Sequence, residues 1–177
     1  MDEVFSVRKV CEKCLANAKD VFFSFKDLEK AYDTIDRHLL WQILRVYGVG
    51  GKLLKAAQSF YVDSRACVRV GIDVSEWFPV NVGLRQGCVM SRWFFNVYMD
   101  GVVRKMNVRV LGKGLKLLST NGGWFEINQL LFADDTALVA DLEEKLCRLV
   151  SEFGRVCERR KLRVNVGKST VIRYAWK

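Results

Sequence analysis

Residues Leu130 to Ala140, with the sequence LLFADDTALVA, place two adjacent aspartates, Asp134 and Asp135, between two apolar runs of strand length. This pattern predicts a β-hairpin with both carboxylates at its tip. Unpaired charge beside a protein core is unfavourable, and hard divalent cations prefer oxygen ligands, so the pair indicates a metal site. Aspartate also favours ordinary polar turns, and the hairpin on its own leaves both interpretations open.

A second group of acidic residues follows another apolar run. Residues Val21 to Phe25 predict a strand that leads to Asp27, and Glu29, Asp33 and Asp36 come after it. A carboxylate at the end of a strand leaves the sheet edge into an open cleft, which suits a metal ligand. Asp27 is equally able to cap the helix predicted after it, and both roles can hold at once.

Between the two acidic groups lies a glycine-flanked loop, GLRQGCVMS at Gly83 to Ser91, followed by an aromatic-rich stretch at Arg92 to Met99. With this loop, four segments stand in a specific order. They are DLEKAYD at Asp27 to Asp33, the loop itself, FADD at Phe132 to Asp135, and KLRVNVGKS at Lys161 to Ser169. In this order the chain resembles the palm of the reverse transcriptases of non-LTR (LINE-type, Jockey-like) retrotransposons, whose motifs A, B, C and D the four segments match.

The resemblance covers residues 21 to 173 and implies a fold of the α+β class. The expected architecture is a polymerase palm, in which an antiparallel sheet packs on helices and a β-hairpin is inserted. The length of 177 residues fits one domain, so residues 1–177 are expected to form a single reverse transcriptase domain. By the same resemblance, most of the fingers would precede residue 1 and the thumb would follow residue 177.

The resemblance also implies a catalytic site that uses two Mg²⁺ ions, with Mn²⁺ as an alternative. Asp27 and Asp134 would bind both ions, Asp135 would supply an auxiliary carboxylate, and the backbone carbonyl of Leu28 would complete one coordination shell. Such ions stabilise the attacking and leaving oxygens when a primer 3′-hydroxyl attacks the α-phosphate of a nucleotide. Carboxylates this crowded raise one another's pKa in the absence of cations.

Further site residues follow from the same motifs. Tyr32 stands where the family holds an aromatic ring against the sugar, which excludes a 2′-hydroxyl; the alternative is a packing tyrosine on a helix. Arg85, Gln86 and Gly87 would line the pocket for nucleotide and template, with the glycine allowing close backbone approach.

Motif D adds Lys168, which would donate a proton to the pyrophosphate leaving group or contact a phosphate, and Asn165, which would fix the loop around it. One position departs from the family pattern. Arg92 stands where a proline usually follows the motif B serine. This difference predicts an altered start of the motif B helix.

The spacing of apolar residues predicts the remaining elements. Helices are expected at 1–19, 37–47, 51–60, 91–106 and 141–160, a hairpin at 66–71 and 77–82 with 72–76 as its connection, and closing strands at 162–166 and 170–172. A glycine-punctuated excursion is expected at 112–123, before the segment Trp124 to Ile127.

Charge indicates an anionic partner. Lysine and arginine number 29 against 20 acids, which gives +9, and residues 148–177 contain nine basic residues and two acids, a local excess of +7. Beside polymerase motifs this excess favours nucleic-acid phosphate, and the implied partners are an RNA template, a DNA primer and deoxynucleoside triphosphates. A solvated helix face followed by a tail is the alternative.

The sequence predicts an intracellular protein of the nucleus or cytoplasm, with no membrane partner. No apolar run reaches the ~18 residues that span a bilayer, and scattered cysteines suit a reducing compartment. It makes no prediction of an oligomeric state. Two functional hypotheses remain open: a reverse transcriptase palm with intact carboxylates, and a non-catalytic retroelement remnant that at most binds nucleic acid.

Overall fold

The computed structural model describes residues 3–119 and 121–175, which form two compact units. The first unit comprises residues 1–31 and 102–177, and the second comprises residues 32–101. The chain therefore leaves the first unit after its first strand and returns to it within a long helix.

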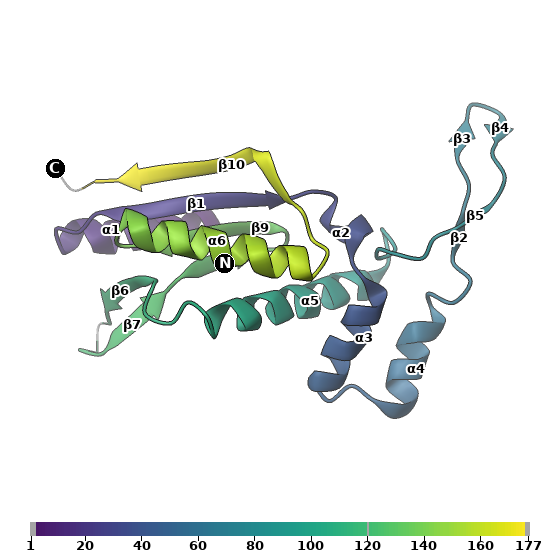
Figure 1. Ribbon diagram of the computed structural model, residues 1–177, viewed down its shortest axis with the longest axis horizontal. Coiled ribbons are helices and arrows are strands. Elements are labelled where there is room, and N and C mark those ends of the chain that lie inside the picture. Colours follow the sequence, from purple (N-terminus) through teal and green to yellow (C-terminus); the bar gives the residue numbers. More distant parts are fainter. Residues whose placement is uncertain (1–2, 120, 176–177) are drawn as a thin grey trace. The chain divides into compact units, whose positions relative to one another are not determined.

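The first unit contains a four-stranded antiparallel sheet in the order β10-β1-β9-β8 (Figure 1). Its strands are β1 (Val21–Leu28), β8 (Gln129–Phe132), β9 (Asp135–Ala140) and β10 (Val164–Tyr174). Strands β8 and β9 form the hairpin that the sequence predicts around the two aspartates. Strand β1 pairs with β9 on one side and β10 on the other, so it lies inside the sheet.

Two helices of the first unit bury apolar faces. Helix α6 (Glu143–Arg159) packs against β9 and β1 (Figure 1). Its buried residues recur at helical spacing, as the sequence predicts: Leu146, Leu149, Phe153, Val156 and Cys157. Helix α1 (Glu3–Ala16) contributes Val10 and Cys14 to a separate apolar cluster with β1 and β9.

That cluster also contains residues of a second, two-stranded ladder. Strands β6 (Leu115–Leu118) and β7 (Trp124–Ile127) pair antiparallel, and Leu115 and Leu117 alternate into the cluster. The glycine-punctuated excursion expected at 112–123 therefore contains a strand, at Leu115–Leu118, that the sequence did not identify. Every second residue of this strand is buried, Leu115 and Leu117, and this burial stabilises the strand despite the flanking glycines.

The second unit is mainly helical. Its elements are α2 (Ala31–Thr34), which begins at the last residue of the first unit, α3 (Arg37–Val46), α4 (Gly51–Ser59) and the first part of α5 (Val89–Asn107). Asp36 caps α3 by accepting a hydrogen bond from the backbone N–H of Leu39 at 3.0 Å. The rings of Trp41, Tyr61 and Phe94 pack together, with centroids 5.8 to 6.2 Å apart.

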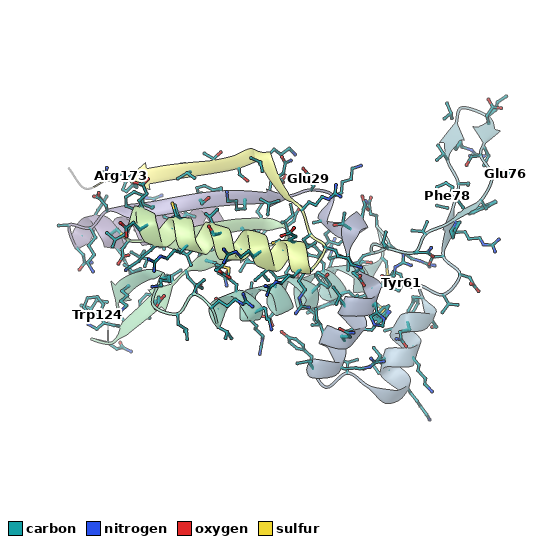
Figure 2. All side chains as sticks on the ribbon, viewed as in Figure 1. Glu29, Tyr61, Glu76, Phe78, Trp124 and Arg173 are labelled. Carbon is teal, nitrogen blue, oxygen red and sulfur yellow. The ribbon has the colours of Figure 1, made fainter. Side chains whose placement is uncertain are left out.

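A narrow arm separates α4 from α5. It consists of two short antiparallel ladders, β2 (Arg65–Ala66) with β5 (Phe78–Pro79) and β3 (Arg69–Val70) with β4 (Asp73–Val74). Figure 2 shows Glu76 and Phe78 on this arm. The structure contains the inserted hairpin that the sequence predicts. Its connection is shorter than the predicted 72–76, because Asp73 and Val74 pair with Val70 and Arg69. The turn between them begins at Gly71, whose φ is +63°.

Two other predicted boundaries differ. The N-terminal helix covers Glu3–Ala16 rather than 1–19, and residues 1 and 2 lie outside the described residues. The two closing strands expected at 162–166 and 170–172 are one strand, β10, whose pairing with β1 shifts register in the middle. The apparent gap between them is a bulge, so the chain stays extended where the sequence suggested a break.

Arg37 fixes the segment that leads to the motif B loop. Its guanidinium donates hydrogen bonds to the carbonyls of Gly83 at 2.7 Å, Val80 at 2.7 Å and Val82 at 3.0 Å. Gly83 itself has φ +80°, and a Cβ there would lie 2.7 Å from the Asp33 carbonyl oxygen, so glycine is required. The loop is therefore anchored at its start by one side chain and one close backbone contact.

Replacing Arg37 should release this segment. We expect Arg37→Ala to cost about 2 kcal/mol locally, because hydrogen bonds from a charged donor are lost, and to accelerate amide hydrogen exchange at Gly83 and Leu84 roughly 30-fold. Arg45→Ala, an exposed position on the same helix, is the matched control. Equal exchange rates in the two variants would contradict the anchoring role.

Candidate active site

The predicted catalytic acids lie at one end of the sheet of the first unit. The ladder between β1 and β9 runs from Phe22 opposite Ala140 to Lys26 opposite Thr136. Asp27 and Asp135 are the next residues on the two antiparallel strands. Figure 2 labels Glu29 just beyond β1 at this end, and Arg173 toward the opposite end of β10.

Asp134 occupies the turn of the β8–β9 hairpin. Phe132 pairs with Asp135, so the turn consists of Ala133 and Asp134 alone. Ala133 has φ +55°, in the left-handed region that side chains other than glycine rarely adopt. A two-residue hairpin needs this conformation, so strain is held next to the acidic pair.

Asp27 and Asp135 line one cavity of about 350 Å³, together with Lys26 and Lys168. Partial desolvation of the carboxyl, followed by the charges of Asp134 and Asp27, raises the pKa of Asp135. Asp27 and Asp134 are therefore both within electrostatic reach of Asp135. Across residues 3–119 and 121–175, however, no three acidic, histidine or cysteine side chains gather closely enough to form a metal-ligand cluster.

A bulge in the sheet places motif D against motif A. Phe25 pairs with Thr170, and the next pair is Asp27 with Asn165. The chain therefore moves two residues along β1 but five residues along β10 between these pairs. The extra residues of β10 contain Lys168. Bulges of this kind redirect side chains and are frequent beside active sites.

The redirected side chains contact Asp27 directly. Asn165 Nδ2 donates a hydrogen bond to Asp27 Oδ2 at 3.1 Å, and Lys168 Nζ lies 3.9 Å from the same oxygen. Asn165 also holds its own loop, because its Oδ1 accepts from the backbone N–H of Lys168 at 3.3 Å and its carbonyl accepts from Ser169 Oγ at 2.7 Å. Asn165 therefore contacts both Asp27 and the segment that contains Lys168, and the roles of Asn165 and Lys168 in catalysis stay predictions.

The donor set fits a divalent cation. Carboxylate oxygens are the ligands that Mg²⁺ and Mn²⁺ prefer. The pKa of Asp135 is raised first by desolvation and then by the charges of Asp134 and Asp27. Asp27, Asp134 and Asp135 are the residues able to hold such an ion. Leu28, the buried last residue of β1, stays a predicted ligand through its backbone.

The predicted nucleotide-binding residues line a different cavity, of about 640 Å³, within the second unit. Tyr32, Arg85, Gln86 and Gly87 all contribute to its wall. The Tyr32 ring stacks on Phe95, with centroids 4.4 Å apart and planes 11° apart. The structure thus brings the four residues together, and Tyr32 is half-buried against the helix behind it.

Contacts within the second unit hold two of these side chains. Gln86 Nε2 donates to Asp33 Oδ1 at 3.0 Å, which links motif B to motif A. Arg85 lies over the Tyr61 ring at 5.8 Å and reaches Ser64 Oγ at 3.3 Å. Both predicted pocket residues are therefore oriented by neighbours from other segments of the unit.

Sequence analysis missed part of this wall. Arg92, Trp93 and Asn96 also line the cavity, together with Cys88 and Val89. The spacing of 89, 92, 93 and 96 is that of one helical face, which would have identified them. Helix α5 begins at Val89, two residues before the predicted start at 91, and continues through Arg92; an effect of Arg92 on the helix start stays a prediction. Hydrogen bonding from the backbone of Met90 lowers the pKa of the Cys88 thiol.

With this geometry described, comparison with known proteins identifies the family. Residues 2–177 match the family described as reverse transcriptase (RNA-dependent DNA polymerase). The chain belongs to this family. In the described part of this reverse transcriptase domain, no helix combines the length and the apolar character needed to cross a bilayer.

Curated relatives come from retrotransposable elements. The chain is 24% identical over 139 residues to the transposon TX1 uncharacterized 149 kDa protein of Xenopus laevis, covering 78% of the chain and 10% of that protein. It is 26% identical over 132 residues to the Pol polyprotein of the type-1 retrotransposable element R2 of Nasonia vitripennis, covering 72% and 12%. The resemblance to non-LTR reverse transcriptases is thereby confirmed. The chain spans only about a tenth of the length of these relatives.

Solved structures give the same fold. The telomerase of Candida tropicalis in complex with a fragment of telomeric RNA has a TM-score of 0.74 at 13% identity, covering 97% of this chain and 29% of that one. The telomerase of Candida albicans with such a fragment gives 0.74 at 14% identity, covering 97% and 30%. The predicted α+β palm fold is confirmed.

The electrostatics of the acidic end predict a pH-dependent stability. Because the pKa of Asp135 is raised in the folded chain, its ionisation opposes folding at neutral pH and has no effect once the group is protonated in both states. We expect Asp135→Asn to raise the free energy of unfolding modestly at pH 7 and to leave it unchanged near pH 3, below the unfolded pKa of about 3.9.

Urea unfolding of both proteins at the two pH values checks this expectation. Glu144→Gln, an exposed acid in the first turn of α6, is the matched control and should give no gain at pH 7. An Asp135→Asn chain that is no more stable than the original at pH 7 would contradict the raised pKa of Asp135 in the folded chain.

Proposed function

We propose that residues 1–177 are the palm of an RNA-directed DNA polymerase, which extends a DNA primer on an RNA template by two-metal nucleotidyl transfer. The observation that most supports this function is the acidic end of the sheet. There β1 and the β8–β9 hairpin, more than a hundred residues apart in the chain, bring Asp27, Asp134 and Asp135 within electrostatic reach. The family match supports the same reaction class.

In this proposal the acids hold two Mg²⁺ ions, or Mn²⁺, which would stabilise the attacking and leaving oxygens of the phosphoryl transfer. Asp27, Asp134 and Asp135 would hold the ions, with the Leu28 carbonyl as a further ligand. Lys168 replaces part of the missing positive charge at Asp27 and, as the primer is extended, donates a proton to the pyrophosphate. Asn165 positions both partners of that pair.

The cavity of the second unit would bind the incoming deoxynucleoside triphosphate and the template. Arg85 and Arg92 provide positive charge for phosphate, and Gln86 provides donors and acceptors for a base or sugar. Gly87 has φ +79°, which keeps the loop backbone free of a side chain at the wall. The RNA in the telomerase structure supports an RNA partner for this chain as well.

We also propose that the isolated chain is a poor polymerase. The relatives are several times longer, and in the family the fingers and thumb provide contacts to triphosphate and primer. Charge-stabilising contacts account for ~10³ to 10⁵ in rate in phosphoryl transfer. The reaction would occur inside the cell, in the nucleus or cytoplasm, where the six free cysteines stay reduced.

The metal proposal can be tested on the 177-residue chain. We expect Mn²⁺ binding, followed by electron paramagnetic resonance, to weaken about tenfold in Asp27→Asn and in Asp134→Asn, since each substitution removes a charged ligand. Glu144→Gln should bind as the original chain does. Equal affinity in all four proteins would contradict the assignment of the acids as ligands.

Catalysis is tested by primer extension on an RNA template, using the chain expressed with the flanking sequence that its gene encodes. We expect Asp134→Asn to abolish extension while Glu144→Gln retains it, and the 177 residues alone to remain near background. Extension that survives Asp134→Asn would contradict the polymerase proposal. No extension by the longer protein, with metal binding intact, would favour the non-catalytic remnant.

Tyr32 provides a test of sugar selection in the same assay. We expect Tyr32→Ala to incorporate ribonucleotides about tenfold more readily relative to deoxynucleotides, because the ring that would exclude the 2′-hydroxyl is removed. Tyr32→Phe keeps the ring stacked on Phe95 and should keep the original selectivity. Unchanged discrimination in Tyr32→Ala would show that the ring serves only packing.

A further inference from the structure

A second charged cavity of the first unit shares no residue with the acidic one. It has a volume of about 430 Å³ and lies between α6 and the segment that follows α5. We call it the basic groove and define it by its charged residues: Arg109, Lys113, Arg148, Glu152 and Arg155. Four bases against one acid give this surface a net charge of +3.

Helical spacing produces the α6 side of the basic groove. Residues 148, 152 and 155 are separated by four and three positions, so they share one face of the helix. The opposite face contains the buried residues of α6 that pack on the sheet. Two turns separate Arg148 from Arg155, a rise of about 10.5 Å, close to the axial rise of three nucleotides at about 3.4 Å each.

The other side of the groove is held by one apolar anchor. Val110 is 1% exposed, and its carbonyl accepts a hydrogen bond from the backbone N–H of Lys113 at 3.0 Å. This turn holds Arg109 and Lys113 on the wall of the same cavity. The groove therefore has basic side chains on both walls, from segments far apart in the sequence.

Glu152 orients two of the arginines. Its Oε1 lies 2.7 Å from Arg155 Nη1 and its Oε2 lies 3.5 Å from Arg109 Nη1, and its side chain is only 18% exposed. A guanidinium has five N–H donors, so each arginine keeps most of its donors for another anion. Lys113 and Arg148 form no ion pair with any described residue, so both side chains can pair with an anionic ligand.

We propose that the basic groove binds the phosphodiester backbone of RNA or DNA, at a surface separate from the polymerase site. The charge excess, the oriented guanidinium groups and the two-turn spacing all favour a ligand with regularly spaced full charges. A nucleic-acid strand has one negatively charged phosphate at every nucleotide. In this proposal neighbouring phosphates contact the two walls of the groove. The inference goes beyond the proposed polymerisation and does not depend on it.

Binding of a labelled single strand to the 177-residue chain tests the groove. We expect Lys113→Gln/Arg148→Gln to weaken binding about tenfold, and to reduce the slope of log affinity against log salt by about 1.4, since each lost phosphate contact on a single strand removes about 0.7. These two positions avoid the Glu152 ion pairs, so the fold should be kept. RNA and DNA of one sequence are compared, and a loss on both identifies the shared backbone as the ligand.

The matched control is Lys52→Gln/Lys55→Gln, which removes the same charge from exposed positions of α4 in the second unit. It should leave affinity and salt slope close to those of the original chain. If both double variants lose affinity equally, binding follows net charge alone and the groove is not the site.

A chemical footprint gives a second, independent measurement. Cys147 is exposed and lines the groove, whereas Cys67 lies in the second unit. We expect bound RNA to slow modification of Cys147 by N-ethylmaleimide several-fold and to leave Cys67 unchanged, as followed by peptide mass spectrometry. Unchanged labelling of Cys147 would overturn the proposal. Equal protection by poly-glutamate at matched charge would also overturn it, in favour of an acidic protein partner.

Discussion

The pairing of β1 on both of its edges is the constraint on which the acidic site depends. Side chains alternate between the faces of a strand, so a slip of one residue would turn Asp27 to the other face of the sheet. The observed ladder with β9 sets this register, since Phe22 lies opposite Ala140 and Lys26 lies opposite Thr136. The bulge against β10 then allows Asn165 and Lys168 to meet Asp27 without disturbing that register.

Among the described residues, the ion pair at this end of the sheet involves only one of the three acids. One lysine and one amide contact Asp27, but neither neutralises the two carboxylates of the hairpin turn. Desolvation, followed by the charges of Asp134 and Asp27, raises the pKa of Asp135. In the proposed function a bound cation would offset this unfavourable ionisation.

The sequence predicted those elements whose pattern of apolar residues is local. The hairpin around Asp134, the long amphipathic α6 and the strand leading to Asp27 follow from the spacing of apolar residues alone. The pairing of β10 did not follow, because Asn165 and Asp27 are 138 residues apart and a bulge between distant strands leaves no local pattern. Arg92 and Trp93 were not predicted as cavity residues for a different reason. The family motif does not include them, although they share a helical face with Val89 and Asn96.

The first unit separates its charges between two surfaces, and that separation would suit the two binding roles proposed for them. A group of three acids attracts cations but repels the phosphates of a template or primer, so it cannot itself hold a nucleic acid in the absence of metal. Affinity for the strand must come from elsewhere on the chain. Helix α6 is suited to provide it, because one face packs on the strands that position the acids while the other presents Arg148 and Arg155 to solvent. The same helix thus supports the acidic site mechanically and offers the positive charge that the site lacks.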